Sequence, residues 1–296
     1  MFDFCYKLIR KSMPKFVYEA IRGSFFGRKK LIRLDHYRNI FSIYKEAVTG
    51  TDGRYNDFSN KTVLEVGCGN QIFTALFLLA EGCKKVILLD PLLEIFNDDE
   101  RFRRSLSLFK TAMPEFSLSE NEIRKSLLCI NDFQNIPDTF NDKIDIILSH
   151  QTLEHFNDLD IFFSSVYKLL SFDGMSFNKV DLSDHTYHIF DRFKFISLLN
   201  RTNNLNHLRY SAKQFALLND SKCFMNRQLL PVYLRKAADH GLICKITKKS
   251  IFGRNIPIHR DVVEGLDFFD EKELKTTSFE MFLFKNLNQQ ISINEN

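Results

Sequence analysis

The chain has 296 residues, and 44% of them are hydrophobic, which is enough to build one α/β domain with appended segments. Its 41 Lys and Arg residues and 37 Asp and Glu residues leave a net charge of +4, too small to indicate a nucleic-acid-binding protein. No apolar stretch approaches the roughly 18 residues that a membrane-spanning helix needs.

Residues 1–53 predict a basic, amphipathic helical extension. Apolar residues recur there at intervals of three and four, and eleven Lys or Arg residues stand against four acidic ones between Met1 and Glu46. We expect a lid over a ligand pocket, and the alternative is contact of residues 1–46 with an anionic membrane surface. Lys7 and Arg10 interrupt any signal-peptide core, and the six cysteines show no Cys-x-x-Cys pair, so we expect reduced thiols and a cytoplasmic protein.

The next segment predicts a buried strand that turns sharply into a helix. An apolar run over residues 63–66 is followed by Gly67 and Gly69, and a second run over residues 85–89 ends at Asp90, 21 residues after Gly69. A carboxylate at this place in a doubly wound sheet holds ribose hydroxyls, so the pair of features predicts a nucleoside site. Ile72 stands where a dinucleotide-binding turn has its third glycine, which argues against a nicotinamide dehydrogenase. The plain alternative is a structural turn.

Four motifs in chain order resemble those of class I S-adenosylmethionine-dependent methyltransferases. The first is the glycine turn with Glu65, although Gln71 replaces the last glycine of the family pattern. The others are residues 131–137, the strand and Leu-Glu-His ending of residues 143–156, and the helix-to-strand turn of residues 166–174. The resemblance implies S-adenosylmethionine as cofactor. The residues that it implies for cofactor binding are Glu65, Gly67, Cys68, Gly69, Asp90, Asp132, Phe133 and Ser149.

The same resemblance implies an α/β fold with a doubly wound, Rossmann-like, seven-stranded sheet. We expect a cofactor-binding core over residues 54–185, a substrate-binding insertion after the fifth strand over residues 186–230, and a return to the core over residues 231–290 before a short tail, 291–296. A helix over residues 226–238, ended by Gly241, and strands over residues 242–246 and 279–284 supply its last elements.

Polar residues that follow the fifth strand indicate where the rim of the active site lies. Asp181, Asp184 and His185 follow that strand, and imidazoles at His150 and His155 follow the fourth. Any of the three histidines could accept a proton, and His185 beside Asp184 is favoured slightly. Some quinone-biosynthesis relatives bind a cation through Glu, Glu and His on this helix; because Gln151 replaces the first Glu, we predict metal-independent activity.

We therefore expect methyl transfer to an oxygen nucleophile. The rim segment together with residues 226–227 resembles methyltransferases encoded among bacterial surface-polysaccharide genes, which implies a sugar hydroxyl of a surface glycan or its precursor. Aromatic residues could stack on the sugar and basic residues could meet a phosphate: Tyr187, Phe190, Phe193 and Tyr210, and Arg192, Lys194, Arg201 and Arg209. Alternatives are a non-catalytic methyltransferase-like binding protein and an O-methyltransferase of quinones or natural products. Nucleic acid is not expected as a partner, because the Asn/Asp-Pro-Pro-Tyr/Phe motif is missing.

Overall fold

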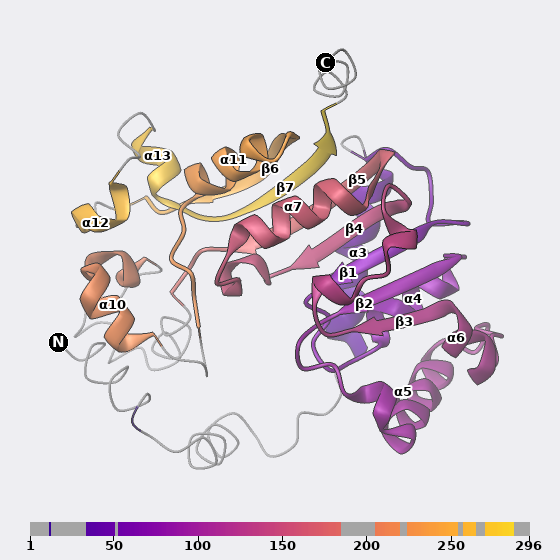
Figure 1. Cartoon of the computed structure of the whole chain (residues 1–296). Coiled ribbons are helices and arrows are strands. Elements are labelled where there is room, and N and C mark those ends of the chain that lie inside the picture. The colour runs from indigo at the N-terminus through magenta and orange to yellow at the C-terminus, as the bar shows by residue number, and fades with distance from the viewer. Residues whose placement is uncertain are drawn as a thin grey trace.

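Seven strands form one mixed sheet in the order β3-β2-β1-β4-β5-β7-β6 (Figure 1). The computed structural model describes residues 12, 34–50, 53–184, 205–219, 224–253, 257–264 and 270–286. The strands are β1 (Thr62–Val66), β2 (Lys85–Leu89), β3 (Leu127–Ile130), β4 (Ile144–His150), β5 (Leu170–Asp181), β6 (Leu242–Ile251) and β7 (Thr276–Lys285). This is the seven-stranded, Rossmann-like sheet that the sequence predicts.

Strands β1 to β5 are parallel, and β7 lies antiparallel between β5 and β6. The chain runs outward from β1 to β3 on one side and then returns to place β4 on the other side of β1. In open α/β sheets, ligands bind at the carboxyl ends of the strands where the order reverses in this way. The topology therefore places a binding site beyond the ends of β1 and β4.

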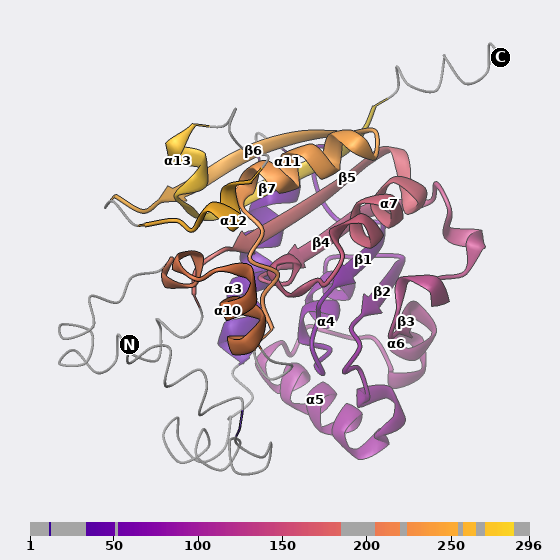
Figure 2. The same cartoon turned by 60° about the vertical axis from the view of Figure 1, so that its left-hand side comes forward.

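Helices cover both faces of the sheet, which is why its central strands are continuous apolar runs. One face packs against α3 (Leu34–Thr49), α4 (Phe73–Ala80), α5 (Asp99–Ala112) and α6 (Glu120–Ser126), and the other against α7 (Leu159–Leu169) and α11 (Leu230–Asp239) (Figure 2). The remaining helices are short: α10 (Ala212–Leu218), α12 (Arg260–Val263), α13 (Glu271–Leu274), and the 3₁₀ turns η1 (Ile95–Asn97), η2 (Phe133–Asn135), η3 (Asp138–Phe140), η4 (Leu153–His155) and η5 (Asn206–Arg209).

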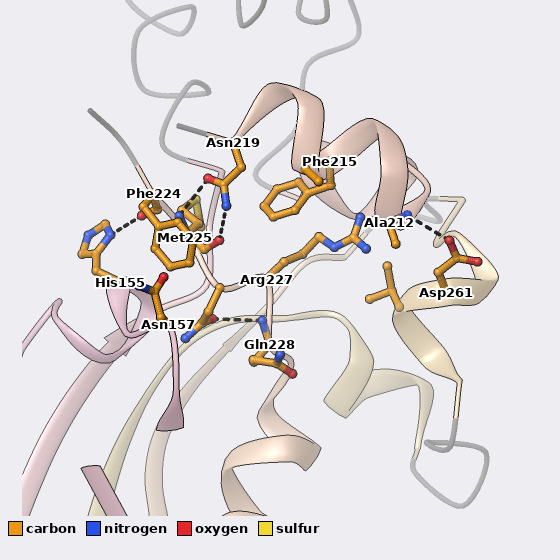
Figure 3. Close-up of a pocket in the computed structure, with 13 residues that line it drawn as sticks. His155, Asn157, Ala212, Phe215, Asn219, Phe224, Met225, Arg227, Gln228 and Asp261 are labelled. Atoms are coloured by element: carbon orange, nitrogen blue, oxygen red, sulfur yellow. Dashed lines mark hydrogen bonds between the residues drawn. The ribbon is translucent and has the colours of Figure 1, made fainter. Parts of the chain in front are cut away.

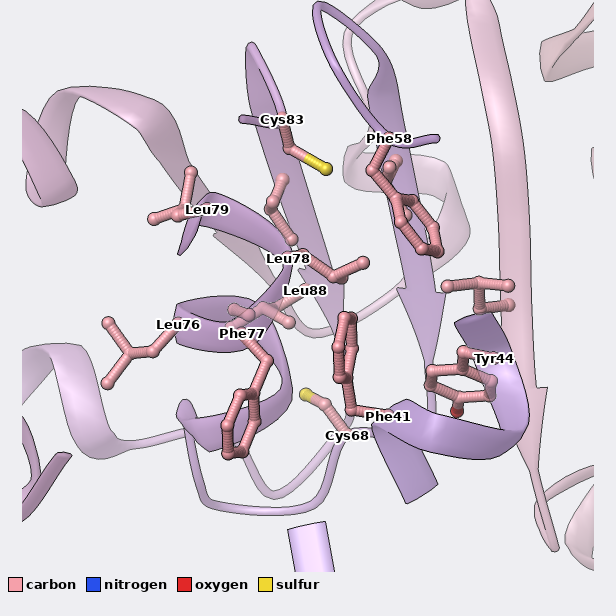
Figure 4. Close-up of a cluster of buried hydrophobic side chains, with 14 of the residues drawn as sticks. Phe41, Tyr44, Phe58, Cys68, Leu76, Phe77, Leu78, Leu79, Cys83 and Leu88 are labelled. Atoms are coloured by element: carbon pink, nitrogen blue, oxygen red, sulfur yellow. The ribbon is translucent and has the colours of Figure 1, made fainter. Parts of the chain in front are cut away.

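Helix α3, the described part of the predicted N-terminal extension, buries its apolar face in the core. Its Phe41 stacks on Phe77 of α4 with ring centroids 5.3 Å apart (Figure 4). Tyr44 of the same helix meets Phe177 of β5 edge-on. This face is therefore occupied by the protein itself. The membrane-contact alternative concerns residues 1–46. Residues 34–46 belong to α3, and residues 1–33 lie outside the described residues apart from Ser12. Within the described ranges, none of the helices is long and apolar enough to cross a membrane.

The predicted C-terminal elements are present, but the helix begins later than predicted. Helix α11 begins at Leu230, four residues later than predicted, and Pro231 stands in its first turn, where a missing N–H costs no hydrogen bond. Gly241 follows the helix with φ +70°, as the predicted stop signal requires. The four preceding residues, 226–229, are not helical, and three of them line a cavity described below.

Candidate active site

A cavity of about 550 Å³ lies beyond the carboxyl ends of β1, β2 and β3, where the topology predicts a ligand. We call it the strand-end cavity. Its volume is within the range of about 300–1,000 Å³ that small-molecule sites occupy. Four of the predicted cofactor residues and one predicted catalytic histidine line it: Gly67, Asp90, Asp132, Phe133 and His155.

The glycine turn after β1 forms one wall of this cavity. Gly67 has φ +81°, and a Cβ there would lie 2.2 Å from the Thr152 side chain, so no larger residue fits without displacing that neighbour. Gly69 has φ +64° and open space on its side-chain face. The turn thus exposes bare backbone toward a ligand, and Gly67 is required by both its conformation and its surroundings.

Asp90 ties this turn to the end of β2. Its carboxylate accepts hydrogen bonds from the backbone N–H of Gly69 and of Leu92, both at 2.8 Å, and its side chain is buried apart from the part that lines the cavity. A carboxylate has about four lone-pair directions, so two backbone donors leave capacity for hydroxyl groups. Asp90 can therefore hold the loop and bind a ribose at once.

Asp132 and Phe133 form the opposite wall, after β3. The Asp132 carboxylate accepts the Gln134 N–H at 2.9 Å and caps η2, which is the local turn that an Asp at a strand end favours. The Phe133 ring lies 6.2 Å from that of Phe156 and 6.3 Å from that of Phe162, so it belongs to an aromatic cluster. This wall offers an apolar face and a carboxylate to a flat ring.

Glu65 lies beneath the glycine turn, on the face of the sheet that α3 covers. Burial raises the pKa of its carboxyl to about 7, against the opposing effect of the Thr74 and Tyr44 hydroxyls. Tyr44 donates to Oε1 over 3.5 Å, whereas the buried Oε2 makes no hydrogen bond with the described residues. An orphaned carboxylate oxygen beside a backbone turn that excludes side chains fits the ammonium end of S-adenosylmethionine.

Two predicted cofactor residues turn their side chains away from the strand-end cavity. The Cys68 thiol is buried, donates to the Gly69 carbonyl over 3.3 Å, and has its pKa raised well above the ordinary value by burial. The Ser149 hydroxyl donates to Asn178 Oδ1 of β5 at 2.8 Å. These side chains stabilise the turn and the sheet.

The candidate proton acceptors stand in different environments. Burial, with Lys179 and His36 nearby, lowers the pKa of His150 to about 4, so this ring is neutral and weakly basic at physiological pH. His155 lies in η4, is exposed, and its Nδ1 is 2.5 Å from the Phe224 carbonyl oxygen. His185, the favoured candidate, lies outside the described residues.

The predicted acidic partners lie at the end of β5. Asp181 accepts the Ser183 N–H at 2.9 Å and the Gln151 side-chain amide at 3.4 Å, and Asp184 is buried. The neutral side-chain amide of Gln151 thus donates to the carboxylate of Asp181. Among the residues that the structure describes, no three His, Cys, Asp or Glu side chains group as cation ligands. Metal-independent activity stays a prediction.

A second cavity, of about 770 Å³, adjoins the first beneath α10. We call it the α10 cavity, and His155 and Asn157 line both cavities. Figure 3 shows α10 above it, the segment 224–228 below, and α12 at one end. Its other lining residues are Ala212, Phe215, Ala216, Asn219, Phe224, Met225, Asn226, Arg227, Gln228, Asp261 and Val262.

The sequence predicts a substrate-binding segment over residues 186–230, but the side chains that line the α10 cavity differ from those predicted. Tyr187, Phe190, Phe193, Arg192, Lys194 and Arg201 lie outside the described residues, Arg209 is exposed, and neither it nor Tyr210 lines the cavity. Phe215, Arg227 and Asp261 carry its distinctive chemistry instead. One signal was available for Arg227, because the pair of residues 226–227 belonged to the narrower resemblance.

A family model described as a methyltransferase domain matches residues 38–237. Solved structures similar to this chain include an S-adenosylmethionine-dependent methyltransferase from Mesorhizobium loti, at 12% identity, with 77% of this chain and 92% of that chain covered and a TM-score of 0.41. Another is phosphoethanolamine N-methyltransferase 2 from Haemonchus contortus with S-adenosylhomocysteine, at 11% identity, with 94% and 60% covered and a TM-score of 0.47. A search of curated proteins returns no match.

Proposed function

Because the chain belongs to the methyltransferase domain family, and so transfers methyl groups from S-adenosylmethionine, we propose that its acceptor is a sugar hydroxyl of a bacterial surface glycan or its precursor. The α10 cavity supports a sugar as the acceptor. That cavity meets the strand-end cavity at His155 and Asn157, so a group bound in one is presented to a group bound in the other.

The lining of the α10 cavity favours a polyhydroxylated acceptor. Asn157 and Gln228 offer amide groups, which can both donate to and accept from hydroxyls, and Asp261 offers a carboxylate, which accepts from them. Phe215 and Phe224 add flat apolar faces on which a pyranose ring can pack. Planar polar groups combined with aromatic rings are the chemistry that sugar recognition needs.

We assign cofactor binding to the walls of the strand-end cavity. Asp90 would hold the ribose hydroxyls, Asp132 and Phe133 the adenine, and Glu65 the methionine end beneath the turn at Gly67. When bound, S-adenosylmethionine supplies a methyl group already activated by its sulfonium charge. The protein then has to align the acceptor hydroxyl with that methyl group and remove one proton.

We assign proton removal to His155. A carbonyl oxygen can only accept, so Nδ1 of His155 carries the proton of the bond to Phe224, and the basic lone pair of the neutral ring lies on Nε2. A sugar hydroxyl becomes acidic only as its oxygen gains the methyl group. A weak base that is correctly oriented therefore suffices.

The first experiment is calorimetry with S-adenosylhomocysteine. We expect binding by the wild-type protein, and about ten- to hundredfold weaker binding by Asp90→Ala, the scale for losing hydrogen bonds to a charged group. Asp239→Ala, at an exposed carboxylate at the end of α11, is the matched control and should bind normally. Absence of binding by the wild type would overturn the cofactor assignment, whereas binding without methyl transfer to any acceptor would favour the non-catalytic alternative.

The second experiment identifies the acceptor. Surface glycan from a deletion strain is analysed by mass spectrometry for O-methyl content, alongside the small-molecule methyl products of the same cells. Loss of a glycan O-methyl group supports the proposal. Unchanged glycan methylation with loss of a small-molecule product would reject the glycan acceptor and support a natural-product O-methyltransferase.

A further inference from the structure

Arg227 occupies an unusual position in the α10 cavity. Its backbone has φ +56°, a left-handed conformation that costs a non-glycine residue roughly 1–2 kcal/mol. Outliers of this kind persist where the surrounding structure holds them, and they concentrate at binding sites. The strained backbone at Arg227 therefore points to a binding role for its side chain.

The guanidinium of Arg227 is rigidly held. Its Nη1 donates to the Tyr210 carbonyl at 2.6 Å. Its Cζ lies 4.5 Å from the centroid of the Phe215 ring, which supports the planar group (Figure 3). A guanidinium has five N–H donors, so this one bond leaves an edge that can make the paired hydrogen bonds of a carboxylate or phosphate. The side chain is therefore preorganised for an anionic ligand.

Among the described residues, no close carboxylate cancels the charge of Arg227. Within the described residues no acidic side chain lies within ion-pair distance of Arg227, although Asp261 lies across the same cavity. The Asp261 carboxylate accepts the Ala212 N–H at 2.9 Å and lies 3.3 Å from His259 Nδ1. Burial lowers the pKa of Arg227, which records the cost of removing this cation from water. A half-buried cation in a large polar cavity is stabilised when an anion joins it.

We propose that the α10 cavity contains an oxyanion subsite in which Arg227 binds a phosphate or carboxylate group of the acceptor. This inference rests on the proposed function, since it describes the acceptor of the same reaction. It narrows the acceptor class to anionic sugars, such as sugar phosphates or uronic acids. The hydroxyl to be methylated then lies near His155, and the anionic group anchors the other end of the molecule at Arg227.

The experiment uses three probes that differ only in the group at C6: glucose 6-phosphate, glucuronate and glucose. Each is titrated by calorimetry into the full-length protein with S-adenosylhomocysteine present. We expect one or both anionic probes to bind at least about tenfold more tightly than glucose, the scale of a charge-assisted hydrogen bond. The relative affinities of the two anionic probes show whether the subsite prefers phosphate or carboxylate.

Variants then assign the effect to Arg227. Arg227→Asn removes the guanidinium while keeping a residue that tolerates the left-handed conformation, so we expect the protein to fold and the preference for anionic probes to disappear. Arg227→Lys should retain part of it, because a lysine keeps the charge without the planar fork. Arg235→Gln, which removes an exposed cation of α11, is the control and should behave as the wild type.

The outcomes separate this inference from the proposed function. Equal binding of all probes, no binding of any probe to the wild type, or unchanged anion preference in Arg227→Asn would overturn the subsite. Binding of S-adenosylhomocysteine by each variant is measured in parallel. If anion binding depends on Arg227 but the deletion strain keeps its glycan methylation, the subsite stands and the glycan assignment fails.

Discussion

The Nδ1 atom of His155 lies 2.5 Å from the carbonyl oxygen of Phe224, and this bond joins η4, the turn that follows β4, to a segment 69 residues away in the chain. Asn226 strengthens the link, since its backbone N–H donates to the Glu154 carbonyl and its side-chain amide donates to the Leu153 carbonyl, both at 2.8 Å. The segment that lines the α10 cavity is thereby attached to η4. His155 is oriented where the two cavities meet.

The first prediction concerns this histidine. His155→Ala should lower kcat by about 10²- to 10⁴-fold, the usual contribution of a general base, while S-adenosylhomocysteine binds with little change. Turnover with labelled S-adenosylmethionine and an identified acceptor measures the first, and calorimetry the second. His240→Ala, which removes an imidazole bonded to Asp160 at 2.8 Å, is the control. If His185→Ala loses turnover and His155→Ala keeps it, the role belongs to His185.

The second prediction compares two glycines of the same turn. Gly67→Ala places a Cβ 2.2 Å from Thr152 in a left-handed backbone, whereas Gly69→Ala meets nothing within 4 Å. We expect Gly69→Ala to cost roughly 1–2 kcal/mol of unfolding free energy from backbone strain alone, and Gly67→Ala a further 1–3 kcal/mol from overpacking. Urea unfolding measures both. Equal losses in the two variants would show that Thr152 moves aside at no cost.

Much of the fold could be predicted, and four of the eight residues implied for cofactor binding line the strand-end cavity, because these signals are local in sequence. The strand, glycine turn and helix at residues 62–80 are contiguous, and the parallel register of β1 and β2 brings Asp90 to Gly69. In a strand buried on both faces, however, apolar neighbours do not reveal which polar side chain faces a ligand. The resemblance implies Ser149 for cofactor binding, and its hydroxyl bonds to Asn178 inside the sheet, so the role of this residue stays a prediction.

The α10 cavity could not be predicted in the same way, because its chemistry comes from separate segments. Phe215, Arg227 and Asp261 belong to α10, to the extended segment before α11, and to α12. No periodicity links them, and only tertiary packing brings them together. The Tyr44 and Glu65 pair is another example, since a helix predicted as a lid supplies a hydrogen bond under the glycine turn.

The third prediction is that cofactor affinity depends on pH through Glu65. Burial raises the pKa of this carboxyl to about 7, and only the ionised form can pair with the ammonium end of the cofactor. Affinity for S-adenosylhomocysteine should therefore increase by up to about tenfold between pH 6 and pH 8, as the ionised fraction increases. Calorimetry across this range is the measurement. In Glu65→Gln the affinity should be weaker and nearly constant, and an unchanged slope in that variant would assign the pH dependence to another group.

The last prediction is that Glu154 makes the stability of the fold depend on pH, an effect separate from catalysis. Its side chain is 1% exposed, and neither oxygen makes a hydrogen bond with the described residues. Burial raises the pKa of Glu154 from 4.5 to about 8; the Asp181 carboxylate adds to this effect, and the nearby backbone N–H groups of Glu154 and Asp181 partly offset it. The folded protein therefore keeps this carboxyl protonated at pH values where the unfolded chain has already released the proton.

Protonation of Glu154 makes the free energy of unfolding depend on pH. Between about pH 4.5 and pH 8 the folded state binds more protons than the unfolded state, so the stability that Glu154 contributes is complete below this window and is lost as the pH rises through it. The slope for one such group is about 1 kcal/mol per pH unit. Glu154→Gln keeps the shape of a neutral carboxyl and cannot ionise, so its unfolding free energy, measured in urea from pH 5 to pH 8, should fall less steeply than that of the wild type by this amount. Glu115→Gln, at an exposed carboxylate, should leave the slope unchanged. Parallel curves for Glu154→Gln and the wild type would mean that Glu154 is already ionised in the folded protein, with a partner that stabilises its charge.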